Sequence, residues 1–388
     1  MSNIVELKEG DRRMAQVSVI LVGFLPNPRI ENRIRLERTL FDLHVVCWDR
    51  CKNMMPPPQA EGFHLHCIRI PAENDPMKRL LPYKRFCQAA KRLLREIQPD
   101  MIHVQGLDML RIACQMKRES KKPLAVLYEV ADLHRLLVDR QYGLRRLAQT
   151  VLKKADIRYS GQADLMILTS ERYYDTYFKH FVPQRKVLYL PNIPNLSALA
   201  AYRKKDPTHD FTVGFIGGVR YKEQMRHLIE AAQQCHMHLL IAGFETEPAE
   251  IEPLCRAYDR GTWVGRFDYA REAAALYGKC DVMYAVYDAD MANVRVALPN
   301  KLYEAVYCEM PLIVAKGTYL QQLVESWGVG LAIDHTSVEA LATVLCRLRE
   351  DTALYAQICG NCRRQRQRLN PEQNAQALQN RLTELCSL

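Results

Sequence analysis

The sequence from Leu298 to Ala315 reads LPNKLYEAVYCEMPLIVA and predicts a helix followed by a buried strand. Pro299 and Asn300 favour the start of a helix, which we expect to run over Leu302–Cys308. The apolar run Leu312–Ala315 then has the length and composition of a strand that is buried on both faces. A helix that leads directly into such a strand is typical of a parallel α/β sheet.

The same alternation extends in both directions and occurs twice along the chain. Before the prolines of Leu190–Asp210, buried strands are predicted at Val17–Gly23, Leu43–Trp48, Phe63–Ile70, Met101–Val104, Leu124–Val130 and Asp164–Thr169. After them, strands are predicted at Phe211–Gly217, Met237–Gly243, Trp263–Gly265, Asp281–Tyr287, Leu312–Ala315 and Gly330–Ile333. We therefore predict an α/β fold of two Rossmann-like, doubly wound domains that face each other across a cleft, over residues 1–195 and 196–370. A helix over 371–388 can cross back to the N-terminal domain.

Length and composition exclude several classes of protein. A chain of 388 residues is too long for one ordinary core, and 48% hydrophobic residues are enough for two. No run has the length of a membrane-spanning helix, and the first residues lack the apolar segment of a secretory signal. The 13 cysteines are scattered along the chain, and Cys359 and Cys362 form a CxxC pattern. We interpret them as reduced thiols of a cytoplasmic protein.

The formal net charge of +10 lies entirely within residues 1–195. This asymmetry predicts an anionic partner for the first half, such as a membrane surface or a phosphorylated acceptor. Nucleic acid is disfavoured because no RNA- or DNA-binding module is recognisable. Met77–Ile97 predicts a basic helical stretch, interrupted near Pro82. Its basic face can lie on an anionic membrane on the inner face of the cell, or it can simply face solvent.

The turn after the predicted strand Phe211–Gly217 is the first candidate binding site. Gly217 and Gly218 let the backbone approach a ligand closely, and amides at the start of the next helix can bind phosphate. Arg220 and Lys222 could add charge-assisted contacts to a diphosphate. GxGxxG and Walker A patterns are absent, so a plain strand–helix turn with solvent-facing basic residues is the alternative.

Lys301 and Glu304 form the second candidate site. A lysine in the first turn of a helix opposes the helix dipole, so its presence calls for an anionic partner. Glu304 lies one turn later on the same face, where it could accept hydrogen bonds from two hydroxyls of a ribose. The alternative is a weak intrahelical ion pair between the two side chains.

Leu298–Ala315 resembles the donor-site motif of retaining glycosyltransferases of the GT-B fold, family 4 type. Other segments are similar to this family in the same order over nearly the whole chain, namely Asn27–Ile30, Pro99–Asp108, Ala163–Glu171, Gly217–Ala231, Arg260–Asp281 and Val324–Gly330. The resemblance implies transfer of a sugar from a UDP-sugar or GDP-sugar to a glycan or lipid-linked acceptor, in surface polysaccharide or glycolipid assembly. Residues 196–370 would bind the donor and residues 1–195 the acceptor.

The resemblance also implies roles for individual residues. Glu304 would hold the ribose, and Arg220, with Lys222 or Lys301, would neutralise the leaving diphosphate without a metal ion. No cofactor other than the donor is implied. The predicted catalytic residues are Asp132 and Arg220, and the predicted donor-binding residues are Gly217, Gly218, Arg220, Lys222, Lys301, Leu302 and Glu304.

The sequence departs from the family pattern at two places. Val296 stands where the first of two glutamates is usual, eight positions before Glu304. The usual His–Asp pair of the first domain reads Ala131-Asp132, and His134 is a candidate substitute. No general base is assigned, and Glu129 and Asp132 are the acids to test. A nucleotide-sugar epimerase of the same fold, and a non-catalytic donor-binding partner of another transferase, are the alternative functions.

Overall fold

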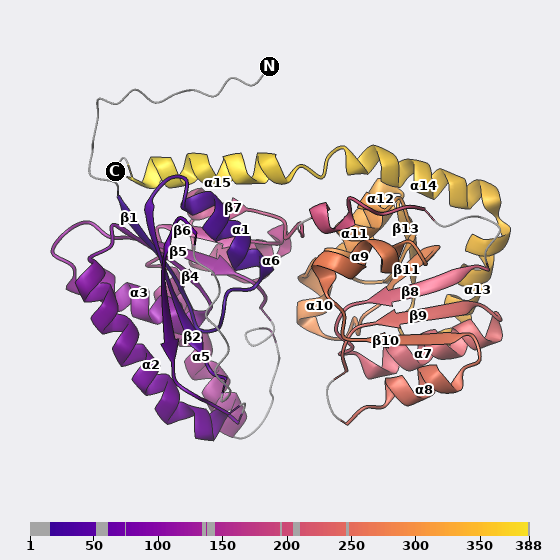
Figure 1. Ribbon diagram of the computed structural model, residues 1–388, viewed down its shortest axis with the longest axis horizontal. Helices are drawn as coiled ribbons and strands as arrows, with labels where there is room; N and C mark the ends of the chain where they lie inside the picture. Colours follow the sequence, from indigo (N-terminus) through magenta and orange to yellow (C-terminus); the bar gives the residue numbers. More distant parts are fainter. Residues whose placement is uncertain are drawn as a thin grey trace, which may run out of the picture.

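The computed structural model describes residues 16–51, 61–73, 75–133, 137, 144–194, 196–204, 210–245 and 248–386. It contains two parallel sheets, each with helices packed on it, in two domains that lie side by side (Figure 1). The prediction of two Rossmann-like, doubly wound domains is therefore confirmed. His134 lies outside the described residues.

The sheet of the N-terminal domain has the strand order β3-β2-β1-β4-β5-β6-β7. Its strands are β1 (Val17–Val22), β2 (Asp42–Asp49), β3 (His64–Arg69), β4 (Met101–Gln105), β5 (Ala125–Val130), β6 (Leu165–Leu168) and β7 (Val187–Tyr189). β7 was not predicted, because its three half-buried residues are too few to form a recognisable apolar run.

The helices of this domain are α1 (Pro28–Glu37), α2 (Pro76–Ile97), α3 (Leu107–Glu119), α5 (Leu144–Ser160) and α6 (Glu171–Thr176). The prediction that the basic helix is interrupted near Pro82 is wrong, because α2 is continuous through this residue. Pro82 lies in the second turn and removes one backbone donor, whose partner would be the carbonyl of the exposed Lys78. Water can satisfy that carbonyl.

The sheet of the C-terminal domain has the strand order β10-β9-β8-β11-β12-β13. Its strands are β8 (Thr212–Ile216), β9 (His238–Ala242), β10 (Gly261–Gly265), β11 (Val282–Ala285), β12 (Leu312–Ala315) and β13 (Gly330–Ile333). The helices around it are α7 (Lys222–Gln234), α8 (Ile251–Ala257), α9 (Tyr269–Tyr277), α10 (Ala292–Val296), α11 (Asn300–Tyr307), α12 (Tyr319–Trp327), α13 (Val338–Glu350) and α14 (Thr352–Arg366).

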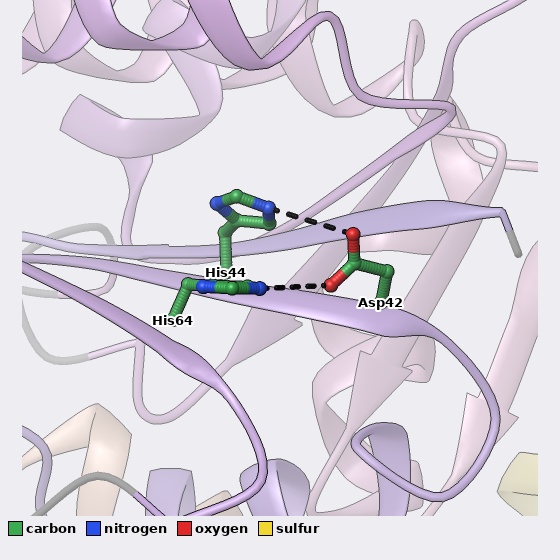
Figure 2. A group of neighbouring side chains, drawn as sticks. All are labelled: Asp42, His44 and His64. Atoms are coloured by element: carbon green, nitrogen blue, oxygen red, sulfur yellow. Dashed lines mark ion pairs between the residues drawn. The ribbon is translucent and has the colours of Figure 1, made fainter.

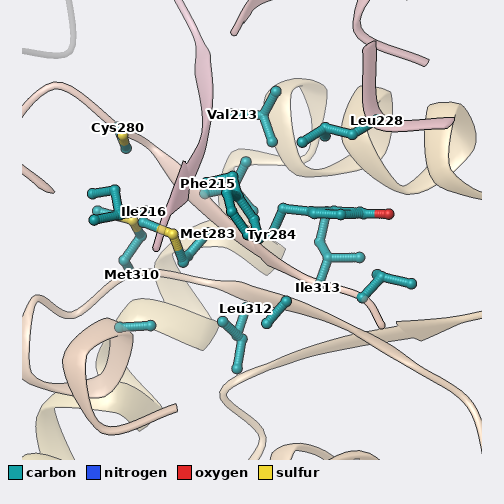
Figure 3. Packing of buried hydrophobic residues seen from close by; sticks show 14 of the residues in the cluster. Val213, Phe215, Ile216, Leu228, Cys280, Met283, Tyr284, Met310, Leu312 and Ile313 are labelled. Carbon is teal, nitrogen blue, oxygen red and sulfur yellow. The ribbon is translucent and has the colours of Figure 1, made fainter. Parts of the chain in front are cut away.

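The core of the C-terminal domain lies between this sheet and its helices (Figure 3). Phe215, Tyr284 and Ile313 lie in register on three neighbouring strands, and Leu228 of α7 belongs to the same hydrophobic cluster. Cys280 lies so close to Gly214 that a Cβ at position 214 would stand 2.4 Å from its sulfur. This tight packing fixes the end of β8, and therefore the turn that follows it.

The last helix, α15 (Pro371–Cys386), returns to the N-terminal domain along one edge of the molecule (Figure 1). Leu378 and Leu382 are fully buried against strands of the first sheet, in a cluster with Met101, Leu127, Leu165 and Ile167. Arg381 donates a hydrogen bond to the carbonyl of Arg185. Across the described residues, no helix combines the length and apolar character that a bilayer crossing requires.

Candidate active site

A cavity of about 260 Å³ lies between the two domains, at the carboxyl ends of both sheets. The N-terminal domain contributes Ala131, Asp132 and Tyr173 to its wall. The C-terminal domain contributes Gly218, Arg220, Tyr287, Asn293, Leu298 and Lys301, among others. Carboxyl ends of parallel strands are where doubly wound sheets bind ligands.

A second cavity of about 660 Å³ lies in the N-terminal domain alone, at the ends of β1, β2, β4 and β5. Its wall includes aromatic, cationic and polar side chains, among them Trp48, Arg50, Arg79, Tyr83, Gln105 and Asp108. Ala131 and Asp132 line both cavities. The two cavities therefore meet at Asp132, and a group bound in one can reach a group bound in the other.

The turns that follow β8 and β9 each require a glycine. Gly217 has φ +141°, and Gly243 has φ +153°. A Cβ on Gly243 would stand 1.8 Å from the carbonyl oxygen of Gly217, so the two loops could not lie together with any larger residue there. The amide of Gly217 donates to the carbonyl of Ala242 at 2.8 Å, which fixes the turn against β9.

Lys301, in the first turn of α11, points its ammonium group toward this turn. The residue is 8% exposed, and its Nζ lies 4.0 Å from the centroid of the Phe215 ring and 3.4 Å from the Tyr287 hydroxyl. Within the part of the chain that the structure describes, no carboxylate forms an ion pair with it. Burial lowers its pKa to about 8, despite the opposing effect of Glu304. A buried ammonium group that borders a cavity is suited to bind an anion.

Glu304 lies one turn further along α11 and is 5% exposed. The hydroxyls of Tyr269 and Tyr277 donate hydrogen bonds to its two oxygens, at 2.8 and 2.5 Å. A carboxylate can accept about four hydrogen bonds. The two tyrosines therefore hold the carboxylate in one orientation, and Glu304 is not among the residues that line the 260 Å³ cavity.

The other predicted donor-binding residues lie in different surroundings. Arg220 is exposed and lines the cavity beside Gly218. Lys222 does not line it, because its Nζ lies 2.9 Å from Glu250 and donates to the carbonyl of Pro248, so it joins the starts of α7 and α8. Leu302 is fully buried in the core and positions α11.

Glu129 is completely buried in an ion-pair network beneath the N-terminal cavity. Arg33 donates to it at 2.9 and 3.1 Å, and Nε2 of His103 lies 3.4 Å away. Burial alone would raise the pKa of Glu129, but Arg33, His103 and Arg29 together lower it below its usual value. Glu129 is thus an ionised anchor for α1 and lines only the 660 Å³ cavity, whereas Asp132 lines both cavities.

His103 completes this network on the other side. Its Nδ1 lies 2.5 Å from Glu37, which also accepts a hydrogen bond from the hydroxyl of Ser18 at 3.0 Å. Burial would lower the pKa of His103, but Glu37 and Glu129 raise it to about 9. The imidazolium therefore sits between two buried carboxylates at neutral pH.

Val296 belongs to a contact between the domains. It is buried in the hydrophobic cluster of the N-terminal domain, and its carbonyl accepts a hydrogen bond from Ser170 at 2.6 Å. Nearby, the side chain of Asn293 accepts from the amide of Leu133 at 3.0 Å. An apolar domain contact occupies the position where the family pattern has its first acid.

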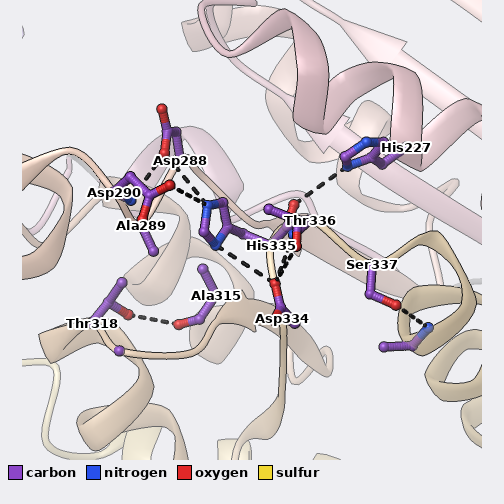
Figure 4. A network of polar contacts seen from close by, with 12 residues as sticks. His227, Asp288, Ala289, Asp290, Ala315, Thr318, Asp334, His335, Thr336 and Ser337 are labelled. Carbon is purple, nitrogen blue, oxygen red and sulfur yellow. Dashed lines mark hydrogen bonds and ion pairs between the residues drawn. The ribbon is translucent and has the colours of Figure 1, made fainter.

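The loops after β11, β12 and β13 are tied together beside the cavity (Figure 4). The Nε2 atom of His335 lies 3.5 Å from Asp288 and 3.7 Å from Asp290. Thr318, which lines the cavity, donates to the carbonyl of Ala315 at 2.9 Å. These contacts hold the cavity wall in place.

Sequence reasoning missed the tyrosines around α11. Tyr287 contacts Lys301, and Tyr269 and Tyr277 orient Glu304. Tyr269 and Tyr277 lie at the two ends of α9, and the pairing of this helix with α11 is a tertiary contact that no local pattern encodes. Tyr287 was detectable, since it follows a buried strand at the edge where ligands bind.

Comparisons with known proteins match both halves of the chain. Residues 33–193 match the family model described as "Glycosyl transferase 4-like domain", and residues 210–351 match "Glycosyl transferases group 1". The succinoglycan biosynthesis protein ExoL of Rhizobium meliloti is 22% identical over 275 residues, covering 67% of each chain.

Solved structures share the fold over nearly the whole chain. Sucrose-phosphate synthase from Thermosynechococcus elongatus superposes with a TM-score of 0.74 at 18% identity, covering 96% of this chain and 99% of the other. HepE of Anabaena in complex with UDP-glucose gives a TM-score of 0.68 at 15% identity, over 95% and 99% of the two chains.

Proposed function

Since the chain belongs to the GT-B glycosyltransferases of the group 1 and 4-like type, we propose that it transfers a sugar from a nucleotide-sugar donor to a glycan acceptor. The donor occupies the 260 Å³ cavity and the acceptor the 660 Å³ cavity. The observation that carries this proposal is the buried ammonium of Lys301 at the wall of the smaller cavity, beside Arg220 and the turn at Gly217.

The donor is held by charge at one end and by hydrogen bonds at the other. Lys301 and Arg220 bind the diphosphate, and the glycine turn lets its oxygens approach the backbone. Glu304 accepts from the ribose hydroxyls with the lone pairs that Tyr269 and Tyr277 leave. HepE is solved with UDP-glucose, which favours a uridine diphosphate sugar as the first donor to test.

Transfer relies on stabilisation of the leaving diphosphate by Lys301 and Arg220, without a metal ion. The acceptor hydroxyl attacks the anomeric carbon from the face that the diphosphate leaves, and a diphosphate oxygen takes its proton, so the configuration is retained. Asp132, where the cavities meet, positions the acceptor hydroxyl. Addition of EDTA should leave the rate unchanged.

The acceptor is a growing surface polysaccharide, as the likeness to a succinoglycan biosynthesis protein suggests. Gln105 supports binding of a polar ligand, because within the described residues its buried side-chain oxygen has no hydrogen-bond partner at the cavity. Arg50, whose guanidinium lies 5.7 Å from the centroid of the buried Trp48 ring, and Arg79 offer charge to a phosphate.

A lipid-linked acceptor would bring the enzyme to a membrane. Leu80 and Leu81 of α2 are 63% and 58% exposed, and Leu147 and Val151 of α5 are also exposed. Lys78, Lys84 and Arg85 lie close to the leucines along α2. Exposed leucines among basic residues suit the surface of an anionic bilayer, so we propose peripheral attachment through this end of the N-terminal domain.

Titration calorimetry of the purified chain with UDP, GDP and their sugars tests the proposal. We expect one nucleotide to bind. We expect Lys301→Ala to weaken this binding at least tenfold, which corresponds to a loss of about 1.4 kcal/mol in binding free energy. The control Lys279→Ala changes a lysine outside both cavities. If no nucleotide binds, the proposal fails.

Product analysis separates the functions. With donor and a lipid-linked oligosaccharide, a transferase forms an extended glycan and releases UDP or GDP. An epimerase would form an isomerised sugar from donor alone. A protein that binds donor and catalyses neither reaction would be a non-catalytic partner of another transferase. Val296, which replaces the first glutamate of the family pattern, would agree with that function.

A further inference from the structure

The amino ends of β2 and β3 bring two histidines and an aspartate together on one face of the N-terminal sheet (Figure 2). Asp42 and His44 share a face because side chains alternate along a strand. His64 joins them because it pairs with His44 in the parallel register of β2 and β3. This end of the sheet is opposite to the carboxyl ends that line the two cavities.

The three side chains present their donor atoms toward a common point. His64 Nε2 lies 3.2 Å from Asp42 Oδ1, and His44 Nε2 lies 3.9 Å from Asp42 Oδ2. All three donor atoms lie within 4.8 Å of one another. In a tetrahedral zinc site with bonds of about 2.0 Å, ligand atoms are about 3.3 Å apart, so a small rotation of the exposed His64 suffices.

His66 orients one of these ligands. Its Nε2 lies 2.9 Å from Nδ1 of His44, and the two rings are parallel with centroids 5.1 Å apart. A metal-bound imidazole commonly donates its second ring N–H to a neighbouring acceptor, which fixes the ring. When His44 Nδ1–H donates to His66, the lone pair of His44 Nε2 faces Asp42.

The chemistry of two imidazoles and one carboxylate matches the ligands of Zn²⁺.

We propose that Asp42, His44 and His64 bind a zinc ion that fastens the edge strand β3 to β2, with a water molecule completing the coordination. Asp42 and His44 come from one strand and His64 from the next, so the ion joins the strands. The site lies away from both cavities, so the ion stabilises the fold and leaves sugar transfer unchanged. The proposal is independent of the function proposed above.

The experiment uses the full chain, stripped with EDTA and freed of the chelator, then titrated with ZnCl₂ against a fluorescent competitor. We expect one tight ion per chain. Asp42→Asn and His64→Ala should each weaken binding at least tenfold, and His66→Gln about tenfold. Asp42→Asn is nearly isosteric at an exposed position, and circular dichroism checks that it folds.

A second group, Asp288, Asp290 and His335, could also hold an ion, so His335→Ala is the matched control. Binding that survives Asp42→Asn and His64→Ala but is lost in His335→Ala overturns the proposal, as does the absence of binding. In a parallel titration, Co²⁺ replaces Zn²⁺. A thiolate charge-transfer band would show that a cysteine binds the ion, and this result would also overturn the proposal. Saturating Zn²⁺ should raise the Tm of the wild type by at least about 3 °C and leave that of Asp42→Asn unchanged.

Discussion

The ammonium nitrogen of Lys301 occupies the space beside Gly217, where a Cβ on residue 217 would stand 2.8 Å from it. The backbone of Gly217 has φ +141°, which side chains of L-residues rarely adopt. Gly217 therefore has two effects on the site: it allows the backbone conformation of the turn, and it leaves space for the ammonium group of Lys301.

Gly217→Ala should therefore weaken UDP binding at least tenfold and lower the free energy of unfolding by about 1–3 kcal/mol. Calorimetry and urea unfolding measure the two effects. Gly360→Ala is the control, because a Cβ at this position in α14 has open space around it. This substitution should lower neither the UDP affinity nor the free energy of unfolding. Unchanged UDP affinity in Gly217→Ala would contradict the position given to the diphosphate.

The pKa of about 8 at Lys301 gives donor binding a pH dependence. Above this pH the free protein loses the ammonium charge, so UDP affinity should fall by up to about tenfold per pH unit. Lys301→Met should bind weakly and with little change between pH 7 and 9.5, by calorimetry. A wild-type affinity that stays level across this range would exclude Lys301 from the diphosphate site.

The same lowered pKa affects the stability of the unliganded protein. The unfolded chain keeps the lysine proton up to a pH of about 10.4. Relative to Lys301→Met, the wild type should gain stability as pH rises from about 8 to 10, since only the unfolded state still holds the proton there. Urea unfolding at both pH values measures the difference, and a loss of relative stability would contradict the burial of the charge.

Glu304→Gln tests contact with the ribose. The variant should bind UDP about tenfold more weakly, because the amide replaces one acceptor oxygen by an NH2 donor and cannot accept from both tyrosines and the ribose hydroxyls. With 2′,3′-dideoxyuridine diphosphate, wild type and variant should bind equally. A similar loss for both nucleotides would show that the substitution acts through the fold of α11 rather than through the sugar hydroxyls.

His103 makes the N-terminal domain sensitive to alkaline pH. Its pKa of about 9 exceeds the unfolded value of about 6.5, so its contribution is full below pH 6.5 and is lost as pH rises through 9. The wild type should therefore lose more stability than His103→Gln between pH 6.5 and 9.5 in urea unfolding. Equal losses would mean that the imidazole is neutral between Glu37 and Glu129.

The exposed leucines of α2 should carry membrane binding. Substitution of Leu80 and Leu81 by serine should weaken binding to anionic vesicles at least about a hundredfold in cosedimentation, since each leucine that enters the bilayer contributes roughly 1.5–3 kcal/mol. Leu254→Ser is the control, because Leu254 is an exposed leucine of the C-terminal domain. Equal binding to neutral vesicles, or equal loss in the control, would refute attachment through α2.

Apart from β7, the strands were predictable from sequence, most clearly where a strand is a short, continuous apolar run, as in Val17–Val22 and Leu312–Ala315. Lys301 was predictable because a cation at the start of a helix is locally unfavourable. Lys222 and Arg220 look alike in sequence, and only the packing of α8 decides that Glu250 holds one while the cavity receives the other. The ion pairs around Glu129 join α1 to β4 and β5, a relationship that has no local signature.

The return of α15 to the first sheet links the order of synthesis to the order of folding. The N-terminal domain leaves the ribosome first, but Leu378 and Leu382 of its hydrophobic cluster are made only after the whole C-terminal domain. Until then, α15 cannot cover the patch around Leu127 and Ile167. The two halves accordingly mature together, and cutting the chain after residue 370 would leave the first of them with an unfinished core.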